Sequence, residues 1–273
     1  MKAFRKLFLL TSLLLVVGLA CSLGGGGNTP APAQPQPQPE QPTQAPVQEP
    51  TQEPAPEPTE PPAPTELPAP TEPPAPQAQQ FYTEEFDEPL SGNWDTLTVT
   101  GSTDADPDKV TVEASNGKLV WDFDSKNVYY YLFYNAYTYD DVQISIRADN
   151  RGRNNNNVSL ICRYDPEVGW YEFNIANNGL YDIFYGEVDS NGDIGYYLIT
   201  NGGSNAIKQG KDVNEYSISC VGDKLTLTIN GKEVNSITER NYALREGQVG
   251  VSVSSFDVLP IQIEMDWFEI NEP

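Results

Sequence analysis

The stretch YSISCVGDKLTLTINGK, residues 216–232, decides the fold because it contains two short strands and the turns that end them. Apolar residues alternate with polar ones at positions 216, 218 and 220, and again at 225, 227 and 229. This spacing gives each run one apolar and one polar face, which is the pattern of a half-buried β-strand. Gly222-Asp223 and Asn230-Gly231 supply the residues that tight turns favour. The stretch therefore predicts an antiparallel hairpin.

The same alternation recurs on both sides of this hairpin, in residues 118–124, 142–148, 158–162, 171–175 and 249–253. Turn dipeptides separate these runs, and no run of helical spacing lies among them. About a dozen short strands with one apolar face each imply two sheets that pack face to face. We therefore predict that residues 81–273 form an all-β domain, an antiparallel two-sheet jelly-roll sandwich.

The first residues have the layout of a secretory leader. Lys2, Arg5 and Lys6 precede the apolar run 7–17, and Gly18-Leu19-Ala20-Cys21 resembles the box at which bacterial lipoproteins are cleaved and lipidated. We predict a signal peptide over 1–20 and a lipid on Cys21. The alternative is a plain secretory signal followed by an incidental cysteine. Lipidation would place the protein outside the cytoplasm, anchored to the outer face of the bacterial membrane or cell surface.

Residues 21–80 form a linker that contains most of the 24 prolines. A six-residue unit recurs at 59–64, 65–70 and 71–76, rich in Thr, Glu, Pro and Ala. Dense proline favours polyproline II and excludes helix and sheet. We predict a disordered, extended stalk that holds the domain away from the membrane.

The charge balance excludes several kinds of partner. The chain has 39 acidic and 16 basic residues, a formal net charge of -23, and no histidine. A charge of this sign repels nucleic acid and anionic lipid, so we expect no nucleic acid partner and membrane contact only through the lipid anchor. The lack of histidine removes a Ser-His-Asp triad and the usual zinc ligand. We expect a monomer.

Several motifs, in order, resemble a known superfamily. They are Glu85-Phe86-Asp87, Trp170-Tyr171-Glu172-Phe173 and the closing run 263–270. Their order resembles that of concanavalin A-like lectin/glucanase jelly rolls, and more narrowly that of laminin-G-like and 3-keto-disaccharide hydrolase-like domains of bacterial surface proteins. The resemblance implies a domain that binds glycans, cleaves them or mediates adhesion, and it does not choose among these roles.

The closing run contains a carboxylate motif. Glu264, Asp266 and Glu269 have the Glu-x-Asp-x-x-Glu spacing of laminarinase-type glycosidases, in which one strand carries the nucleophile and the acid/base. A regular strand, however, places Glu269 on the face opposite to the other two unless a bulge intervenes. Only three residues follow the run, whereas such enzymes have more chain there. We therefore expect an ordinary closing strand and no catalytic set.

Cys162 and Cys220 are the cysteines of the predicted domain, and both continue the apolar face of a strand. Outside the cytoplasm two such thiols usually pair. We predict a disulfide between them; the alternative is two separate buried thiols.

A glycan site is expected on the polar sheet face. Residues 127–141 hold many aromatic side chains, some of which must point away from the core, where rings stack on sugars. The alternative is aromatic packing across strands. Polar side chains opposite the core, Asp182 and Arg147 among them, would line the same face, or would only form cross-strand ion pairs. The predicted glycan-binding residues are Tyr130, Tyr134, Arg163, Trp170, Glu172 and Asn174.

Calcium is the one cofactor that the sequence leaves open. Asp104, Asp106 and Asp108 form an acidic turn, and residues 189–193 form a second. Spaced carboxylates suit calcium, which takes six to eight oxygen ligands. Neither turn has the downstream glutamate of an EF-hand loop, so we expect no cofactor and keep the first turn as a weak calcium candidate.

These features favour a surface-tethered lipoprotein that presents a non-catalytic glycan-binding or adhesion domain. They do not decide whether the domain is an enzyme. The alternative is a glycosidase-type hydrolase, either a glycoside hydrolase or a keto-disaccharide hydrolase-like enzyme. A second alternative is a structural spacer in a cell-surface assembly.

Overall fold

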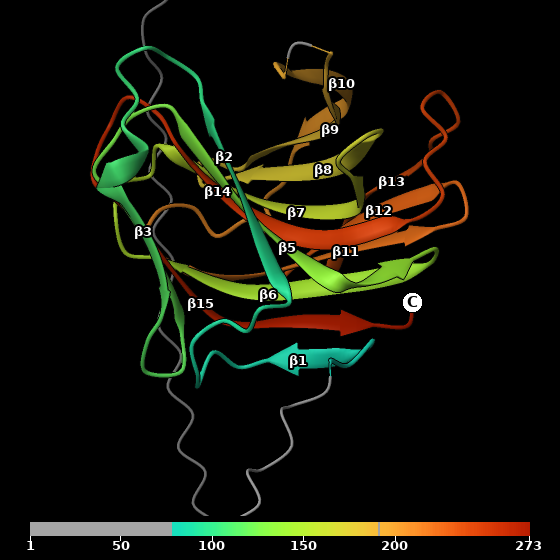
Figure 1. Cartoon of the computed structure of the whole chain (residues 1–273), viewed down its shortest axis with the longest axis horizontal. Coiled ribbons are helices and arrows are strands. Elements are labelled where there is room, and N and C mark those ends of the chain that lie inside the picture. The colour runs from blue at the N-terminus through green and yellow to red at the C-terminus, as the bar shows by residue number, and fades with distance from the viewer. Residues whose placement is uncertain (1–77, 191) are drawn as a thin grey trace, which may run out of the picture. The chain divides into compact units, whose positions relative to one another are not determined.

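The computed structural model describes residues 78–190 and 192–273, in which two antiparallel sheets pack face to face (Figure 1). This confirms the predicted all-β sandwich. Within the described residues the only helical element is one 3-10 turn, Pro107–Lys109. No helix in that part of the chain is long and apolar enough to cross a bilayer. The predicted signal peptide, Cys21 and almost all of the predicted stalk lie outside the described residues.

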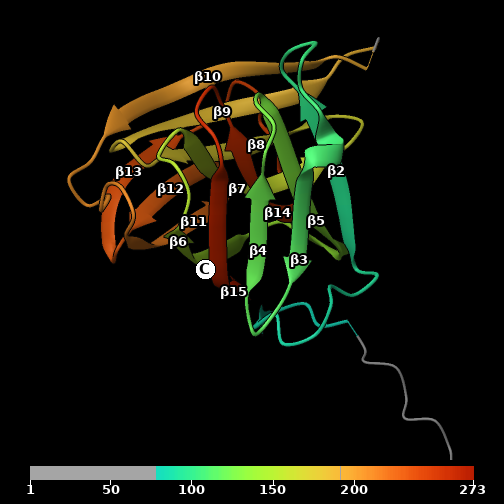
Figure 2. The ribbon, with the colours of Figure 1, turned by 90° about the vertical axis from the view of Figure 1, so that its left-hand side faces the viewer.

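The first sheet has eight strands, and it contains the hairpin predicted from residues 216–232. Tyr216 lies opposite Ile229, and Ile218 lies opposite Leu227. Figure 2 shows β15, β4 and β3 side by side in this sheet. In order, its strands are β13 (Lys232–Thr238), β12 (Lys224–Ile229), β11 (Val213–Val221), β6 (Val142–Asn150), β15 (Ile261–Asn271), β4 (Leu119–Phe123) and β3 (Val110–Ala114), with β1 (Tyr82–Glu84) paired to β15.

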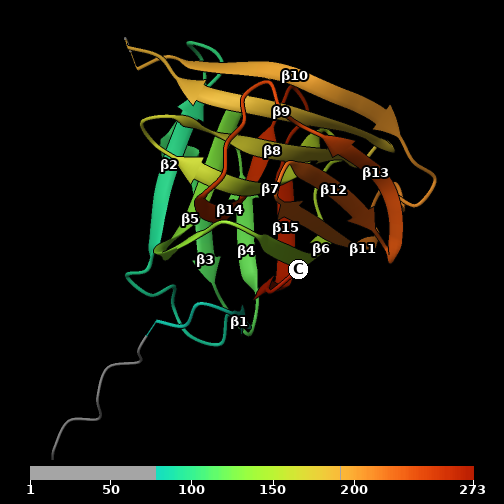
Figure 3. The same cartoon turned by 90° about the vertical axis from the view of Figure 1, so that its right-hand side faces the viewer.

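The second sheet has seven strands, and Figure 3 shows β10, β9, β8 and β7 lying side by side in it. Its central strands are long, so each carries side chains to both faces over several positions. In order, its strands are β10 (Ile194–Gly203), β9 (Leu180–Val188), β8 (Gly169–Ala176), β7 (Asn156–Asp165), β14 (Gly247–Ser255), β5 (Val128–Tyr139) and β2 (Trp94–Thr100).

The main core lies between the sheets and is built from the alternate apolar residues of these strands. Leu160, Phe173 and Val251 from the seven-stranded sheet and Ile146 and Leu227 from the other are all fully buried. Burial of side chains of this size stabilises a fold by roughly 1.5–3 kcal/mol each. The alternation that predicted the strands is therefore also what closes the sandwich.

The predicted disulfide is present, since Cys162 of β7 is bonded to Cys220 of β11. The bond joins the two sheets through the core, where both cysteines are fully buried. The sequence predicted this pair from two cysteines on apolar strand faces, and the structure adds that the bond crosses the sandwich.

Candidate functional site

A cavity of about 210 Å³ opens on the seven-stranded sheet, on the face that points away from the main core. It combines aromatic walls with carboxyl and amide groups, which is the composition of a small-molecule site. Strands β5, β7, β8, β9 and β10 each contribute to it, and Phe256 follows β14 directly. The lining residues are Tyr129, Asn157, Glu172, Asn174, Asp182, Phe184, Tyr196 and Phe256.

Glu172 is the central acidic group of this cavity and is only 2% exposed. Four neutral donors hold its carboxylate. The Ser159 hydroxyl donates to Oε1 over 2.8 Å and the Asn174 amide over 3.4 Å, while Tyr131 and Trp170 each donate to Oε2 over 3.2 Å. Within the described residues no lysine or arginine forms an ion pair with it.

The environment raises the pKa of both carboxyl groups in the cavity. Burial is the main cause for Glu172, and the hydrogen bonds to its carboxylate oppose the shift without cancelling it. Burial also raises the pKa of Asp182, which is half-buried and accepts a hydrogen bond from Asn201. Perturbed carboxyl groups that share one cavity are a recognised mark of a functional site.

The sheet register sets the spacing between these two acids. Asn174 lies opposite Asp182 across the β8–β9 pair, and Glu172 lies opposite Phe184. Glu172 and Asp182 are therefore diagonal neighbours on one face, with Cβ atoms about 7 Å apart in such a pair. Two titratable groups at this spacing can act on the same small molecule.

A chain of hydroxyl groups connects Glu172 to the cavity wall. The Tyr131 hydroxyl donates to Glu172 and lies 2.6 Å from the Tyr196 hydroxyl, which lines the cavity. Burial, followed by the charge of Glu172, raises the pKa of both tyrosines. Both phenols thus keep their protons at neutral pH, and the chain can pass a proton between Glu172 and the cavity.

The floor of the cavity is a second small cluster of buried residues. Tyr131, Phe133, Ile161 and Trp170 are at most 1% exposed and pack together on this face. Gly186 makes room for the Trp170 ring, because a Cβ there would lie 2.3 Å from a ring carbon. This packing fixes the indole that donates to Glu172.

Two serine hydroxyls of β14 lie under the same face. Ser252 and Ser254 are fully buried, and in the described residues neither hydroxyl forms a hydrogen bond. Ser254 lies opposite Tyr129 on one side and Asn157 on the other, and both of those residues line the cavity. A buried hydroxyl without a hydrogen bond lowers the stability of the fold by about 1–3 kcal/mol. These two hydroxyls are therefore free to donate or accept hydrogen bonds beneath the cavity.

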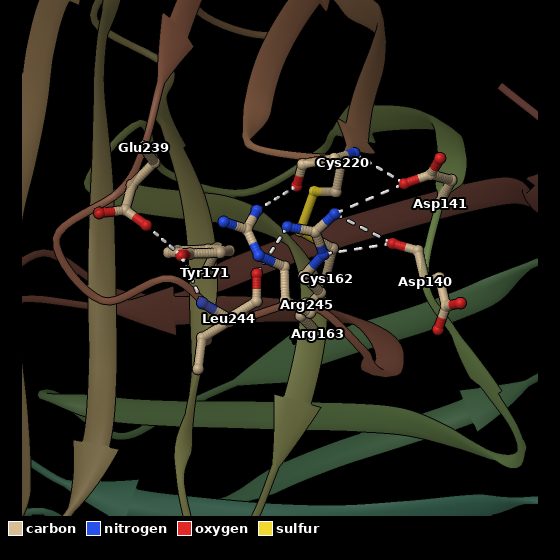
Figure 4. Close-up of a disulfide and its surroundings, with 10 residues drawn as sticks. Asp140, Asp141, Cys162, Arg163, Tyr171, Cys220, Glu239, Leu244 and Arg245 are labelled. Carbon is tan, nitrogen blue, oxygen red and sulfur yellow. Dashed lines mark hydrogen bonds and ion pairs between the residues drawn. A yellow bond between two sulfur atoms is a disulfide. The ribbon is translucent and has the colours of Figure 1, made fainter.

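The predicted position of Arg163 is wrong, because a bulge in β7 moves it off the open face. The register between β7 and β8 shifts between Cys162 and Asp165, and Arg163 has a φ of 56°. Its guanidinium is 1% exposed and donates to the carbonyl oxygens of Asp140 and Leu244 (Figure 4). Arg163 therefore anchors loops beside the disulfide and does not reach the cavity.

The predicted face is also wrong for two tyrosines, and the predicted exposure is wrong for a tryptophan. Tyr130 and Tyr134 lie opposite Val253 and Val249, so they face the main core. The Tyr134 ring packs on Trp94, and the Tyr130 ring on Trp121. Trp170 is on the predicted face but is fully buried in the floor. Of the predicted glycan-binding residues, the structure places Glu172 and Asn174 in the cavity wall.

The carboxylate motif of β15 lies on the other sheet. A register shift between Met265 and Trp267 supplies the bulge that a regular strand lacks, so Glu264, Asp266 and Glu269 are all on the side away from the core. Lys118 lies 3.0 Å from both Glu264 and Asp266, and this bond lowers the pKa of Glu264. The bulge therefore overturns the split between faces that a regular strand would give, and Glu264 and Asp266 are paired with cations.

The acidic turn at 104–108 begins the 3-10 turn. The Asp106 carboxylate accepts from the backbone N–H of Asp108 and lies 3.4 Å from the Lys109 ammonium. Within the described residues no group of three or more Asp, Glu or Cys side chains is arranged to hold a metal ion. The expectation of no cofactor, with this turn as a weak calcium candidate, stays untested.

The sequence of residues 82–263 matches the family of 3-keto-alpha-glucoside-1,2-lyase-like domains, and the chain belongs to this family. A search of curated proteins found no match.

Solved structures share the fold. A glycoside hydrolase family 16 protein of the Bacteroides ovatus mixed-linkage glucan locus, in complex with a product, is 12% identical over 70% of this chain and 99% of its own, with a TM-score of 0.51. The Bacillus licheniformis β-glucanase is 12% identical over 72% and 100%, also with a TM-score of 0.51. At these identities the similarity establishes the sandwich fold.

The family membership overturns the predicted main function. The sequence favoured a non-catalytic glycan-binding or adhesion domain, yet the matched family is named for an enzyme that acts on 3-keto-α-glucosides. The alternative, a glycosidase-type or keto-disaccharide hydrolase-like enzyme, agrees better with this family.

Sequence reasoning placed Asp182 on the polar face but gave it no site role, and it missed Asn157, Tyr196 and Phe256. Tyr196 lies in a run whose glycines and tyrosines carry no clear alternation. Phe256 follows β14, outside any periodic segment. The sequence feature that could have located the site is the polar face of residues 171–175. Asp182 lies on the neighbouring strand, β9, opposite Asn174 on that face.

Proposed function

We propose that the domain is an enzyme that cleaves the glycosidic bond of a 3-keto α-glucoside in the cavity around Glu172 and Asp182. The observation that carries the proposal is the pair of carboxyl groups with raised pKa in one aromatic-walled cavity. Membership of a 1,2-lyase-like family supports the choice of substrate and reaction. The aromatic rings suit the apolar faces of a sugar, and the amides suit its hydroxyls.

The reaction is an elimination that needs one proton acceptor and one proton donor. A ketone at C3 of the sugar acidifies the hydrogen on C2. A base removes this proton, the C1–O bond breaks, a C1=C2 double bond forms, and the leaving oxygen takes up a proton. The products are an unsaturated keto sugar and a free alcohol, whose masses add up to that of the substrate. The reaction consumes no water and needs no oxidant.

Asp182 is assigned the role of the base. It is the more exposed of the two acids, and its carboxylate accepts fewer hydrogen bonds than that of Glu172. A raised pKa brings a carboxylate closer to the pH at which it works and so makes it a better proton acceptor.

Glu172 and the tyrosine chain are assigned the role of the proton source. The raised pKa of Glu172 favours its protonated form, and Tyr131 connects it to Tyr196 at the cavity wall. For this transfer Glu172 is protonated, and the Tyr131 hydroxyl turns from donating to Glu172 to accepting from it and donating to Tyr196. A proton that leaves Tyr196 for the departing oxygen is then replaced from Glu172 through Tyr131. Groups with pKa values raised by burial are suited to this transfer near neutral pH.

The test is product analysis with methyl 3-keto-α-glucoside and the full chain. Mass spectrometry should find methanol and an unsaturated keto sugar whose mass shows that no water molecule was incorporated. Glu172→Gln should lower the activity by about 100-fold or more. The matched control is Glu113→Gln, which changes an exposed residue of the other sheet. Uptake of one water would assign hydrolysis instead, and no cleavage by the wild type would refute the proposal.

We also propose that the domain works outside the cytoplasm on a lipid anchor at Cys21. The disulfide supports this, because disulfides persist in oxidising compartments. Cys21→Ser should leave an uncleaved precursor or release the protein from the membrane fraction. Unchanged fractionation and unchanged mass would contradict the proposal.

A further inference from the structure

We propose that a basic cavity at one end of the eight-stranded sheet binds an acidic sugar, meaning a sugar unit that carries one carboxylate or one sulfate group. The cavity is about 410 Å³, larger than the one around Glu172, and the two share no lining residue. Its cationic side chains are Arg151, Arg153 and Lys211, three of the 16 basic residues in a chain with a net charge of -23. The proposal goes beyond the proposed function and uses none of the groups assigned to catalysis.

The wall of this cavity is built where strands β4 and β6 end and where β11 and β15 begin. The backbone N–H of Gly152 donates to the carbonyl oxygen of Gln262 over 3.0 Å. A Cβ at position 152 would lie 2.3 Å from Gln262 N, so glycine allows this close approach. The Asn150 amide donates to the carbonyl oxygen of Gly210 over 3.0 Å, beside Lys211. The backbone on both sides of the cavity is thus fixed before any ligand binds.

Two of the three cations have no anionic partner. Elsewhere on this sheet, Lys118 and Arg147 are engaged in ion pairs at about 3 Å. Within the described part of the chain, neither Arg153 nor Lys211 forms an ion pair. Unpaired cations that line one cavity raise its local potential and attract anions, even in a protein of opposite net charge.

The charge balance of the cavity selects an anion with a single negative charge. Arg151 is offset already, because its guanidinium lies 2.8 Å from Asp149 and 3.4 Å from Glu264. Asp122 also lines the cavity and offsets one of the two unpaired cations. One positive charge then remains, which matches a carboxylate or a sulfate ester. A phosphate monoester carries about 1.5 to 2 negative charges near neutral pH and would be repelled by Asp122.

The other lining groups suit a sugar ring better than a small inorganic ion. The Asp122 carboxylate accepts hydrogen bonds from hydroxyl groups, and the Gln262 amide can both donate and accept. Pro260 is exposed and offers an apolar surface to the C–H groups of a ring. Such a site would hold the domain on an acidic polysaccharide while the cavity around Glu172 stays open.

The test is calorimetry on the full chain at low salt, with glucuronate and glucose 6-sulfate as probes. Both should bind about tenfold more tightly than glucose, inorganic sulfate or glucose 6-phosphate. The double variant Arg153→Gln/Lys211→Gln should lower the affinity for glucuronate by about tenfold. The matched control, Lys224→Gln/Lys232→Gln, removes the same charge from exposed positions of β12 and β13. It should change the affinity by less than about twofold, because salt screens distant charges.

A capped peptide with the sequence of residues 71–76 carries a carboxylate but no sugar ring, and it should bind about tenfold more weakly than glucuronate. Tighter binding of a polyuronide than of glucuronate would support the proposal with a polymer as the source, and equal affinity per sugar would support it with a free sugar acid. The proposal is overturned if the peptide, inorganic sulfate or glucose 6-phosphate binds as tightly as glucuronate. Equal losses in the two double variants, or no binding of either probe, would also overturn it.

Discussion

The outward faces of the two sheets carry the same kind of side chain in opposite surroundings. On the eight-stranded sheet, Glu264 and Asp266 lie in a ladder of ion pairs with Lys118, Arg147 and Arg151 at 2.9–3.4 Å. On the seven-stranded sheet, Glu172 is buried under aromatic rings and held only by neutral donors.

This difference separates a carboxylate that stabilises a surface from one that can do chemistry. Lys118 lowers the pKa of Glu264 and keeps it ionised, whereas burial raises the pKa of Glu172. A sequence motif reports residue types and spacing but not the surroundings that set the pKa. The enzyme-like spacing therefore occurs on one sheet and the acid–base environment on the other.

The largest expected difference between the faces is in stability, on replacing one tryptophan on each. Trp170→Ala should destabilise the domain by about 3–5 kcal/mol, because Trp170 is fully buried and its loss also removes a donor to Glu172. Trp267→Ala, at a half-buried position of β15, should cost only about 1 kcal/mol. Urea unfolding at neutral pH measures both. Equal losses would mean that the two faces are equally packed.

Loss of the disulfide should affect both faces together, because it joins β7 to β11. Cys162 and Cys220 are 58 residues apart in sequence, and the double Cys→Ala variant should lose about 4 kcal/mol, since an uncrosslinked unfolded chain gains entropy. Unfolding followed by tryptophan fluorescence and by circular dichroism should shift to the same extent. A shift in only one signal would show that the sheets unfold independently.

A smaller effect concerns how stability depends on pH. The folded pKa of Glu172 is raised, so its contribution is fully present below the ordinary glutamate pKa and is lost as the pH rises through the raised value. The folded pKa of Glu264 is lowered, so its contribution is present above the ordinary value and is lost as the pH falls.

Urea titrations between about pH 3 and pH 8 should therefore separate two variants. The wild type should lose stability as the pH rises because Glu172 ionises, and the Glu172→Gln variant should not show this loss. Glu264→Gln should remove a loss toward low pH that amounts to less than about 1 kcal/mol, as for other partly exposed ion pairs. If both substitutions changed the pH dependence of the unfolding free energy in the same direction, the contrast between the two faces would be contradicted.

The sequence predicted the fold well because alternation survives wherever strands are regular. It failed where a strand contains a bulge, since one extra residue exchanges the two faces for everything that follows. The bulge after Cys162 buried Arg163, and the bulge after Met265 brought Glu269 to the same side as Glu264. The tyrosine-rich strand β5 has aromatic side chains on both of its faces, so the sequence could not tell which face points to the core. The pairing of β5 with Val249 and Val253 of β14 decides it.

The cavity was predicted in part for a related reason. Glu172 and Asn174 lie on one short, regular strand, so their shared face followed from spacing alone. Tyr196 and Phe256 reach the cavity through β9–β10 pairing and through the end of β14, which are contacts between distant parts of the chain. Burial, which gives Glu172 its raised pKa, depends on those same contacts.

The comparison of Asp182→Asn with Glu264→Gln tests most directly whether the chemistry belongs to the seven-stranded sheet. Both changes replace a carboxylate by an amide of the same shape, one in the cavity and one in the ion-pair ladder. With methyl 3-keto-α-glucoside as substrate, Asp182→Asn should lower kcat/KM by about 100-fold or more. Glu264→Gln should leave it unchanged. A folded Glu264→Gln variant without activity, or an Asp182→Asn variant as active as the wild type, would contradict the assignment.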